Sequence, residues 1–299
     1  MKLLPRLFPS KRPAFASDVV GMIVEQECAW FRSYAAGIYS GAGAIVDLGC
    51  FVGLTTISLA QGLRANRTAK TAKIHAYDRF LWEDWMKCWW ETKGLPPPEL
   101  VDNSFLPEFL KRTLPWKDQI IVHQEDLGVC PWDNGSIEFL LVDAMKSSDL
   151  AESITRRFFS FLIPGKSYVA HQDFAHFWTS WIHLLQFRLR DSFVVAADIP
   201  KSGTVVFRYR TQFSPEAFGN LSLNSAPVEE IEAAFEYSLG LVSDGKKTNV
   251  VAAKAMAYLH RGDVDRAREV VEANRWGATS FGQDLEAVQR LIRQRTGNE

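Results

Sequence analysis

The amino-acid sequence predicts an α/β protein in which a doubly wound, mainly parallel sheet of about seven strands is followed by a helical C-terminal extension. Short apolar segments alternate with longer segments of helical periodicity from residue 44 to residue 190. Two further apolar segments, 192–197 and 204–209, are joined by a short segment rich in turn formers. That spacing predicts an antiparallel hairpin at the end of the sheet, which makes the sheet mixed.

The predicted strands are short and mostly apolar, as strands covered on both faces are. They occupy 44–48, 73–77, 119–123, 137–142, 167–171, 192–197 and 204–209. Helices are expected from about Leu54, from about Asp149 and around 178–190. Ser17 and Asp18 precede an apolar-periodic segment, which predicts a capped amphipathic helix before the first strand.

The chain divides into three expected parts. Its 299 residues, 47% of them hydrophobic, suffice for a full core. We expect an N-terminal helical lid or brace over 1–40, the sheet domain over 41–212 and the helical extension over 213–299. Within the extension, Val250–Glu272 has the pattern of one tetratricopeptide-type unit or of an ordinary helical hairpin. Either unit must bury its apolar face on the sheet domain or on a second subunit. A homo-oligomer formed through the N- or C-terminal helices is therefore one of the two expected arrangements.

Charge and cysteine usage narrow the class of protein. The formal net charge is −1 with acidic and basic residues interspersed, which argues against a nucleic-acid partner. No apolar run approaches the roughly 20 residues that span a membrane. Cys28, Cys50, Cys88 and Cys130 lie far apart and form no C-x-x-C pair, as is usual for reduced cytoplasmic thiols. We therefore expect a cytoplasmic protein whose partner is a small-molecule substrate.

A glycine-containing turn follows the first predicted strand and is the main functional motif. The strand ends at Asp47, and Gly49 and Gly53 lead into the next helix. Glycines let a ligand approach the backbone, and the N-terminus of a helix offers free N–H groups. Phe51 stands where a dinucleotide fingerprint has its second glycine, which disfavours a pyrophosphate. The turn therefore predicts an adenosine-containing cofactor smaller than a dinucleotide.

Asp47, Gly49, Gly53 and Thr55 resemble motif I of class I S-adenosylmethionine-dependent methyltransferases, and within them the macrocin O-methyltransferase-like group. The order of elements over residues 40–210, including the terminal hairpin, is similar as well. The resemblance implies a Rossmann-like fold with S-adenosyl-L-methionine as the cofactor. It further implies that these four residues form the turn that holds the amino-acid end of the cofactor.

Two acidic residues at strand ends are candidates for the rest of the cofactor site. Asp78 closes the second strand, where a carboxylate accepts hydrogen bonds from both hydroxyls of a ribose. Its alternative role is an exposed turn residue paired with Arg79. Asp126 follows the third strand, where the resemblance implies contact with adenine, and it equally suits a turn residue that accepts backbone N–H bonds.

The candidate catalytic residues follow the fourth and fifth strands. Asp143 emerges from an apolar strand, and Asp173 holds the corresponding place after the next one. The resemblance implies that Asp143 and a pair of acids bind a divalent metal, usually Mg²⁺. Gln172 replaces one of that pair, which weakens the expected metal site. Without a metal, His171 is the nearest general base, and its alternative role is a hydrogen-bonded strand-end residue.

Two further features near these residues admit functional and structural interpretations. Trp82, Trp85 and Trp89 share one helix face in a long insert, which packs on the sheet or stacks on a substrate. Lys146 either holds an acidic group of the substrate or is a solvated loop residue.

The sequence thus favours a methyltransferase that methylates the hydroxyl of a small molecule, such as a sugar or another polyhydroxylated metabolite. Two alternatives remain at this stage. One is a Rossmann-type NAD(P)-dependent oxidoreductase, and the other is a non-catalytic methyltransferase-like scaffold.

Overall fold

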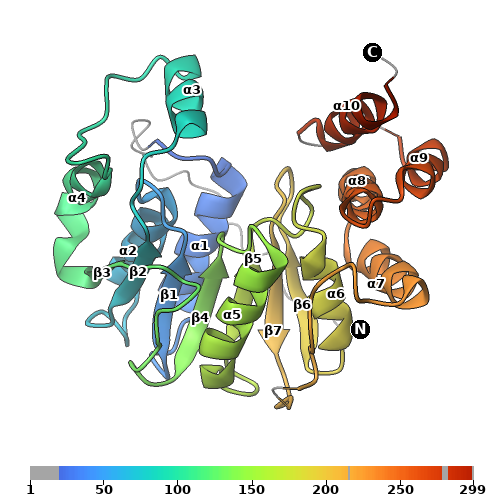
Figure 1. The fold of residues 1–299 in the computed structure, drawn as a ribbon. Helices are drawn as coiled ribbons and strands as arrows, with labels where there is room; N and C mark the ends of the chain where they lie inside the picture. Colours follow the sequence, from blue (N-terminus) through green and yellow to red (C-terminus); the bar gives the residue numbers. More distant parts are fainter. Residues whose placement is uncertain (1–19, 215, 278–281, 298–299) are drawn as a thin grey trace.

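The computed structural model describes residues 20–214, 216–277 and 282–297. A central sheet is covered by helices on both faces, and further helices follow beside its β6–β7 edge (Figure 1). The predicted cap at Ser17 and Asp18 lies outside the described residues. The first described helix, α1, spans Glu25–Gly37, and the Glu27 carboxylate accepts the Val24 N–H at its start at 2.8 Å. Helix α1 therefore begins later than the apolar pattern indicated.

The sheet has seven strands in the order β3-β2-β1-β4-β5-β7-β6, which confirms the predicted Rossmann-like fold class. The first five are parallel, and β7 is antiparallel to both β5 and β6. The strand bounds agree with the predicted ones to within one residue. They are β1 Ala44–Leu48, β2 Ile74–Asp78, β3 Ile120–Gln124, β4 Ile137–Val142, β5 Tyr168–His171, β6 Phe193–Asp198 and β7 Val205–Tyr209.

The apolar strands bury both faces because successive side chains alternate between them. Ile45 and Leu141 pack with helices α1 and α2 (Leu54–Ala65) in one cluster. Val46 and Leu140 pack in another cluster with α5 (Ser148–Phe158) and α6 (Trp181–Arg188). A short 3-10 turn, η2 (Phe159–Phe161), follows α5. This alternation decides which strand-end side chains point into the core.

The insert between β2 and β3 forms the lobe at the upper left of Figure 1. It contains α3 (Asp84–Thr92), α4 (Leu106–Thr113) and the 3-10 helix η1 (Leu114–Gln119). A separate apolar cluster joins it to the turn after β1. The insert therefore stands above the carboxyl ends of β1 and β2.

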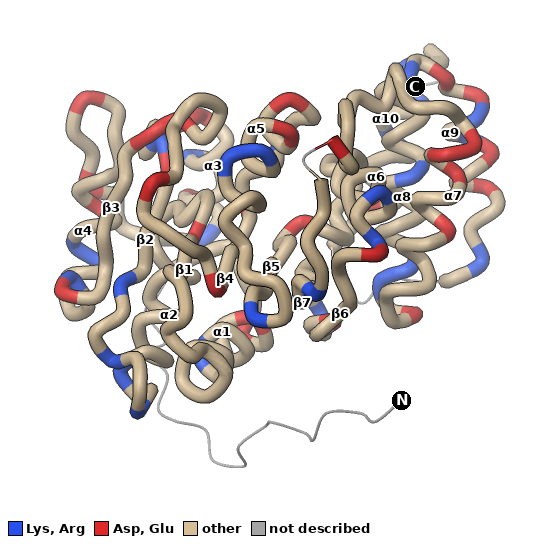
Figure 2. The backbone as a smooth tube through the Cα atoms, turned by 90° about the horizontal axis from the view of Figure 1, so that it is seen from below, with Lys and Arg blue, Asp and Glu red and all other residues tan. Residues whose placement is uncertain are grey.

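The C-terminal extension contains α7 (Val228–Leu241), α8 (Asp244–His260), α9 (Val264–Glu272) and α10 (Asp284–Thr296). Apolar residues of α7 and α8 share one buried cluster with α6, so the extension buries its apolar face on the sheet domain. Acidic and basic residues are interspersed along the backbone (Figure 2). Within the described ranges, no helix is both long and apolar enough to cross a membrane.

Candidate active site

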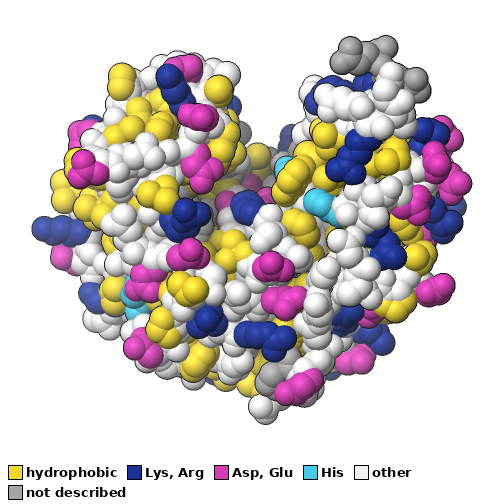
Figure 3. Space-filling view, viewed as in Figure 1, with side chains coloured by type: hydrophobic (Ala, Val, Ile, Leu, Met, Phe, Trp, Pro, Cys, Tyr) yellow, Lys and Arg dark blue, Asp and Glu magenta, His cyan; other side chains and the backbone are white. Residues whose placement is uncertain are grey.

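A cleft of about 1020 Å³ opens at the carboxyl edge of the parallel strands. Figure 3 shows the surface hollowed between the lobe of the insert and the lobe of the extension. Each of the loops that follow β1 to β5 contributes to its lining, as does the β6–β7 turn. Representative lining residues are Gly49, Asp78, Asp126, Asp143, Asp173 and Lys201. Ligands of open α/β sheets gather at this edge.

The turn after β1 is held by its own backbone. Gly49 has φ 84°, and a Cβ there would lie 2.6 Å from the Asp143 carbonyl oxygen. Residue 49 must therefore be glycine because the carboxyl ends of β1 and β4 approach each other closely, whether or not a ligand also needs the space. Phe51 adopts φ 45°, its N–H donates to Asp78 Oδ2 at 3.0 Å, and its ring packs edge-on against Phe105. The turn and the end of β2 therefore form one unit.

Of the four residues predicted to form the cofactor turn, only one lines the cleft. Gly49 lines the cleft, but Gly53, Asp47 and Thr55 do not. Gly53 is the N-cap of α2 with φ 95°, and a Cβ there would lie 2.8 Å from Thr113 Cγ2, so packing against α4 accounts for this glycine. The fully buried Asp47 accepts the Thr55 hydroxyl at 2.8 Å, and its Oδ1 has no partner in the described part of the chain. Burial raises the pKa of Asp47 to about 6.

Asp78 and Asp126, the residues predicted to contact ribose and adenine, both line the cleft. The Asp78 carboxylate also accepts the Phe80 N–H at 2.8 Å, so each of its oxygens receives one backbone bond and keeps acceptor capacity. Burial raises the pKa of Asp78. Asp126 Oδ1 accepts the Gly128 N–H at 2.8 Å, which is the turn role also considered for it.

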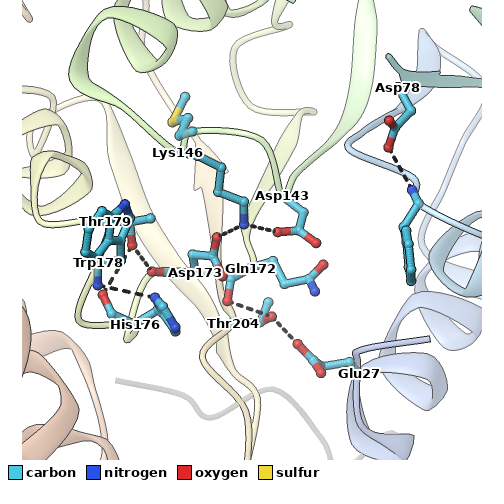
Figure 4. A network of polar contacts seen from close by, with 12 residues as sticks. Glu27, Asp78, Asp143, Lys146, Gln172, Asp173, His176, Trp178, Thr179 and Thr204 are labelled. Atoms are coloured by element: carbon cyan, nitrogen blue, oxygen red, sulfur yellow. Dashed lines mark hydrogen bonds and ion pairs between the residues drawn. The ribbon is translucent and has the colours of Figure 1, made fainter. Parts of the chain in front are cut away.

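Lys146 connects the two acids that were expected to hold a metal (Figure 4). Its Nζ lies 2.7 Å from Asp143 Oδ1 and also contacts Asp173 Oδ2. An ammonium of the chain itself therefore lies between both carboxylates. No group of three His, Cys, Asp or Glu residues that could hold a metal occurs in the described ranges. The donor set does not fit the Mg²⁺ that the resemblance implied, and the metal role of Asp143 and Asp173 is not supported.

The pKa values of Asp143 and Asp173 are shifted in opposite directions. Burial raises the pKa of Asp143 to about 7, against the opposing effect of Lys146. Burial would also raise the pKa of Asp173, but Lys146 and His176 outweigh it and lower that pKa. Partial desolvation in the cleft would lower the pKa of Lys146, yet the two carboxylates raise it, so Lys146 stays cationic. Asp143 is thus the member of this group that is poised to accept a proton near neutral pH.

His171, the predicted alternative base, lies inside the core. It is fully buried at the end of β5, on the side of α6, where its Nε2 lies 2.8 Å from Gln186 Nε2. It does not line the cleft, and burial lowers its pKa to about 3. A group without access to the cleft cannot take a proton from a substrate there, so the catalytic role predicted for His171 is not supported.

The far side of the cleft adds two residues that the sequence did not single out, Glu27 and Trp178, to Gln172 and His176. Gln172, His176 and Trp178 come from the loop after β5, and Glu27 comes from α1. The Trp178 side chain is 42% exposed. Trp82 precedes α3, so the prediction that Trp82, Trp85 and Trp89 share one helix face is wrong. Trp85 lines the cleft, and Trp82 and Trp89 pack with other aromatic rings. A single sequence gives no signal for Glu27, because its helix meets the cleft only through the tertiary fold.

No protein-family model matches the chain, and neither does any curated protein. Among solved structures, that of the 23S rRNA methyltransferase ErmE aligns with 91% of this chain and 98% of its own, at 11% identity and a TM-score of 0.36. That of a cyclopropane-fatty-acyl-phospholipid synthase-like protein from Lactobacillus casei ATCC 334 covers 78% of this chain and 85% of its own, at 11% identity and a TM-score of 0.32. Neither structure is described as a macrocin O-methyltransferase. TM-scores this low carry no functional assignment, which therefore depends on the cleft and the sheet topology.

Proposed function

We propose that this protein is a methyltransferase that uses S-adenosyl-L-methionine. The observation that carries the proposal is the succession of Gly49, Asp78, Asp126 and Asp143 around one cleft at the carboxyl edge of β1 to β4. These strands are the ones that hold the cofactor in the class I enzymes that the sequence resembles. The antiparallel β7 is the other feature shared with that class.

The residues present fit the cofactor. The remaining acceptor capacity of Asp78 suits two ribose hydroxyls, and Asp126 lies at the edge where adenine would bind. Gly49 would face the amino-acid end of the cofactor. Phe51 fills the turn with a ring where a pyrophosphate would need a second glycine, which disfavours NAD(P). Asp47 and Thr55 would support the turn from beneath rather than touch the ligand.

We assign the proton transfer to Asp143. When bound, the cofactor supplies a methyl group made electrophilic by its sulfonium. The protein has to orient a nucleophile and accept its proton. Asp143 has a raised pKa and lies beside the half-exposed Lys146 in the floor of the cleft. Lys146 would keep the Asp143 carboxylate in position and stabilise negative charge on an acceptor oxygen.

The acceptor that fits these groups is the hydroxyl of a small molecule such as a sugar or another polyhydroxylated metabolite. Asp143 and Asp173 offer carboxylate oxygens to several hydroxyls, and Trp178 offers an exposed ring face. Carboxylates together with an aromatic surface suit a polar ring compound.

Isothermal titration of the wild type with S-adenosylhomocysteine and with NAD tests the cofactor. We expect binding of the first and none of the second. Asp78→Ala should weaken binding at least about tenfold through the loss of charge-assisted hydrogen bonds. Glu91→Ala, an exposed residue of α3 that does not line the cleft, is the matched control. NAD binding would instead support the oxidoreductase, and binding of neither compound would support a non-catalytic scaffold.

A further inference from the structure

The far side of the cleft is formed by two short segments, and the C-terminal extension contacts both. The first is the loop after β5, residues 172–180, which carries Gln172, Asp173, His176 and Trp178. The second is the β6–β7 turn, residues 199–204, which carries Lys201, Ser202 and Gly203. The cofactor residues of the proposed function lie at the other end of the cleft, over β1 to β3.

Helix α10 holds the loop through a buried carboxylate. Asp284, at the start of α10, is 7% exposed, and its Oδ2 accepts the Phe177 N–H at 3.0 Å. Phe177 lies between His176 and Trp178, two of the loop residues that line the cleft. The backbone bond therefore fixes the part of the loop that faces an acceptor.

Helix α8 adds contacts to the same loop. The Ser180 hydroxyl donates to the Ala253 carbonyl at 2.8 Å, and this contact is buried. His260 lies with its ring 5.7 Å from that of Trp178 and 5.6 Å from that of Trp181. Within the loop, the Thr179 hydroxyl donates to the Asp173 carbonyl at 2.7 Å. Movement of α8 or α10 would thus be transmitted to Asp173.

Helix α8 also anchors the turn. The buried Lys246 donates to the Thr204 carbonyl at 2.6 Å and lies 2.5 Å from Asp198 Oδ1. Asp198 Oδ2 accepts the Ser243 N–H at 2.8 Å, which adds a bond at the start of α8. The Thr204 hydroxyl donates to Glu27, so the turn links α8 to α1 beside the cleft.

We propose that the C-terminal extension positions the acceptor side of the active site, with Asp284 as the main positioning residue for the loop that carries Asp173, His176 and Trp178. The extension sets the shape in which an acceptor is bound and leaves the cofactor side unchanged. This inference rests on the proposed function, because it takes the far side of the cleft as the acceptor side.

Hydrogen exchange followed by mass spectrometry on the full-length protein tests the positioning role. Asp284→Ala removes the acceptor of the Phe177 N–H, so peptides covering 172–180 should exchange about three- to tenfold faster. Asp284→Asn keeps a carbonyl oxygen at the same place and should restore most of the protection. Peptides covering β1 and α2 should be unaffected, and the affinity for S-adenosylhomocysteine should stay within about twofold of the wild type.

A second variant tests the turn independently. Lys246→Met keeps the length of the side chain and removes both its bond to Thr204 and its ion pair with Asp198, so peptides covering 199–204 should exchange faster. Either variant overturns the inference if its segment exchanges at the wild-type rate or if exchange rises equally in β1 and α2. A loss of S-adenosylhomocysteine affinity in Asp284→Ala as large as that in Asp78→Ala also overturns it. Failure of the wild type to bind S-adenosylhomocysteine would instead remove the proposed function, whatever the exchange rates show.

Discussion

Lys146 Nζ lies 2.7 Å from Asp143 Oδ1 and also contacts Asp173, so one ammonium bridges the acids that follow the carboxyl ends of β4 and β5. Two carboxylates this close would repel each other without a cation between them. The lysine supplies that cation from the same loop, three residues after Asp143. The arrangement leaves Asp143 with a raised pKa and Asp173 with a lowered one.

Removal of this lysine should create a divalent metal site. Lys146→Ala leaves Asp143 and Asp173 without their bridging cation, in a cleft that Gln172 also lines, and carboxylate and amide oxygens suit Mg²⁺ or Mn²⁺ as ligands. We expect electron paramagnetic resonance to detect Mn²⁺ bound to Lys146→Ala and none bound to the wild type. Lys201→Ala, which removes another lysine that lines the cleft, should behave as the wild type. Equal Mn²⁺ affinity of the wild type and Lys146→Ala would contradict the bridging role.

Methyl transfer should depend on pH through Asp143. Burial raises its pKa to about 7, and the charged groups that act on it are Lys146, Asp173 and Asp47. The base must be unprotonated, so activity should rise with pH up to about 7 and fall about tenfold for each unit below that value. A carboxyl carbon titration by NMR, assigned with Asp143→Asn, should give a midpoint near 7. A midpoint near 4 would show that Asp143 is an ordinary carboxylate.

Two buried histidines should make the fold sensitive to acid. Burial lowers the pKa values of His171 and His183 to about 3, below the value of about 6.5 expected in the unfolded chain. The unfolded state therefore binds more protons below pH 6.5. The free energy of unfolding should fall by up to about 1.4 kcal/mol per pH unit for each histidine as the pH drops from 6.5 towards 3.

His183→Leu should reduce that dependence. Neither ring nitrogen of His183 has a hydrogen-bond partner in the described part of the chain, and its ring packs against Phe174 and Phe235. An apolar side chain of similar size should therefore keep stability at pH 7 within about 1.5 kcal/mol of the wild type. Urea unfolding at pH 5 and pH 7 measures both effects. An unchanged pH slope in His183→Leu would refute the burial argument.

Gly49→Ala should disturb stability and cofactor binding together. Its Cβ would lie 2.6 Å from the Asp143 carbonyl oxygen, and its φ of 84° disfavours any side chain. We expect a loss of about 2 kcal/mol or more in the free energy of unfolding, with weaker binding of S-adenosylhomocysteine. Gly37→Ala is the matched control, because a Cβ there meets nothing within 4 Å. Wild-type stability of Gly49→Ala would show that the ends of β1 and β4 can separate freely.

The sheet could be predicted from the sequence because its strands are short apolar segments bounded by turn residues. The strand-end acids Asp78, Asp126 and Asp143 could be placed at the cleft for the same reason. The sequence analysis made His171 a candidate base at the cleft, but alternation along β5 directs its side chain into the core. Val169 packs with α6, and His171, two residues later, lies on the same face of the strand. The Lys146 bridge and the contact of Asp284 with Phe177 could not be predicted. Each depends on side chains that only the tertiary fold brings together.

The crystal structure of the wild type with S-adenosylhomocysteine tests the central claim most directly. The account predicts density in the cleft, with ribose hydroxyls on Asp78, adenine beside Asp126, the amino-acid end at Gly49 and the sulfur directed towards Asp143. A cleft without the compound at saturating concentration, or a ligand bound with its sulfur remote from Asp143, would contradict the account.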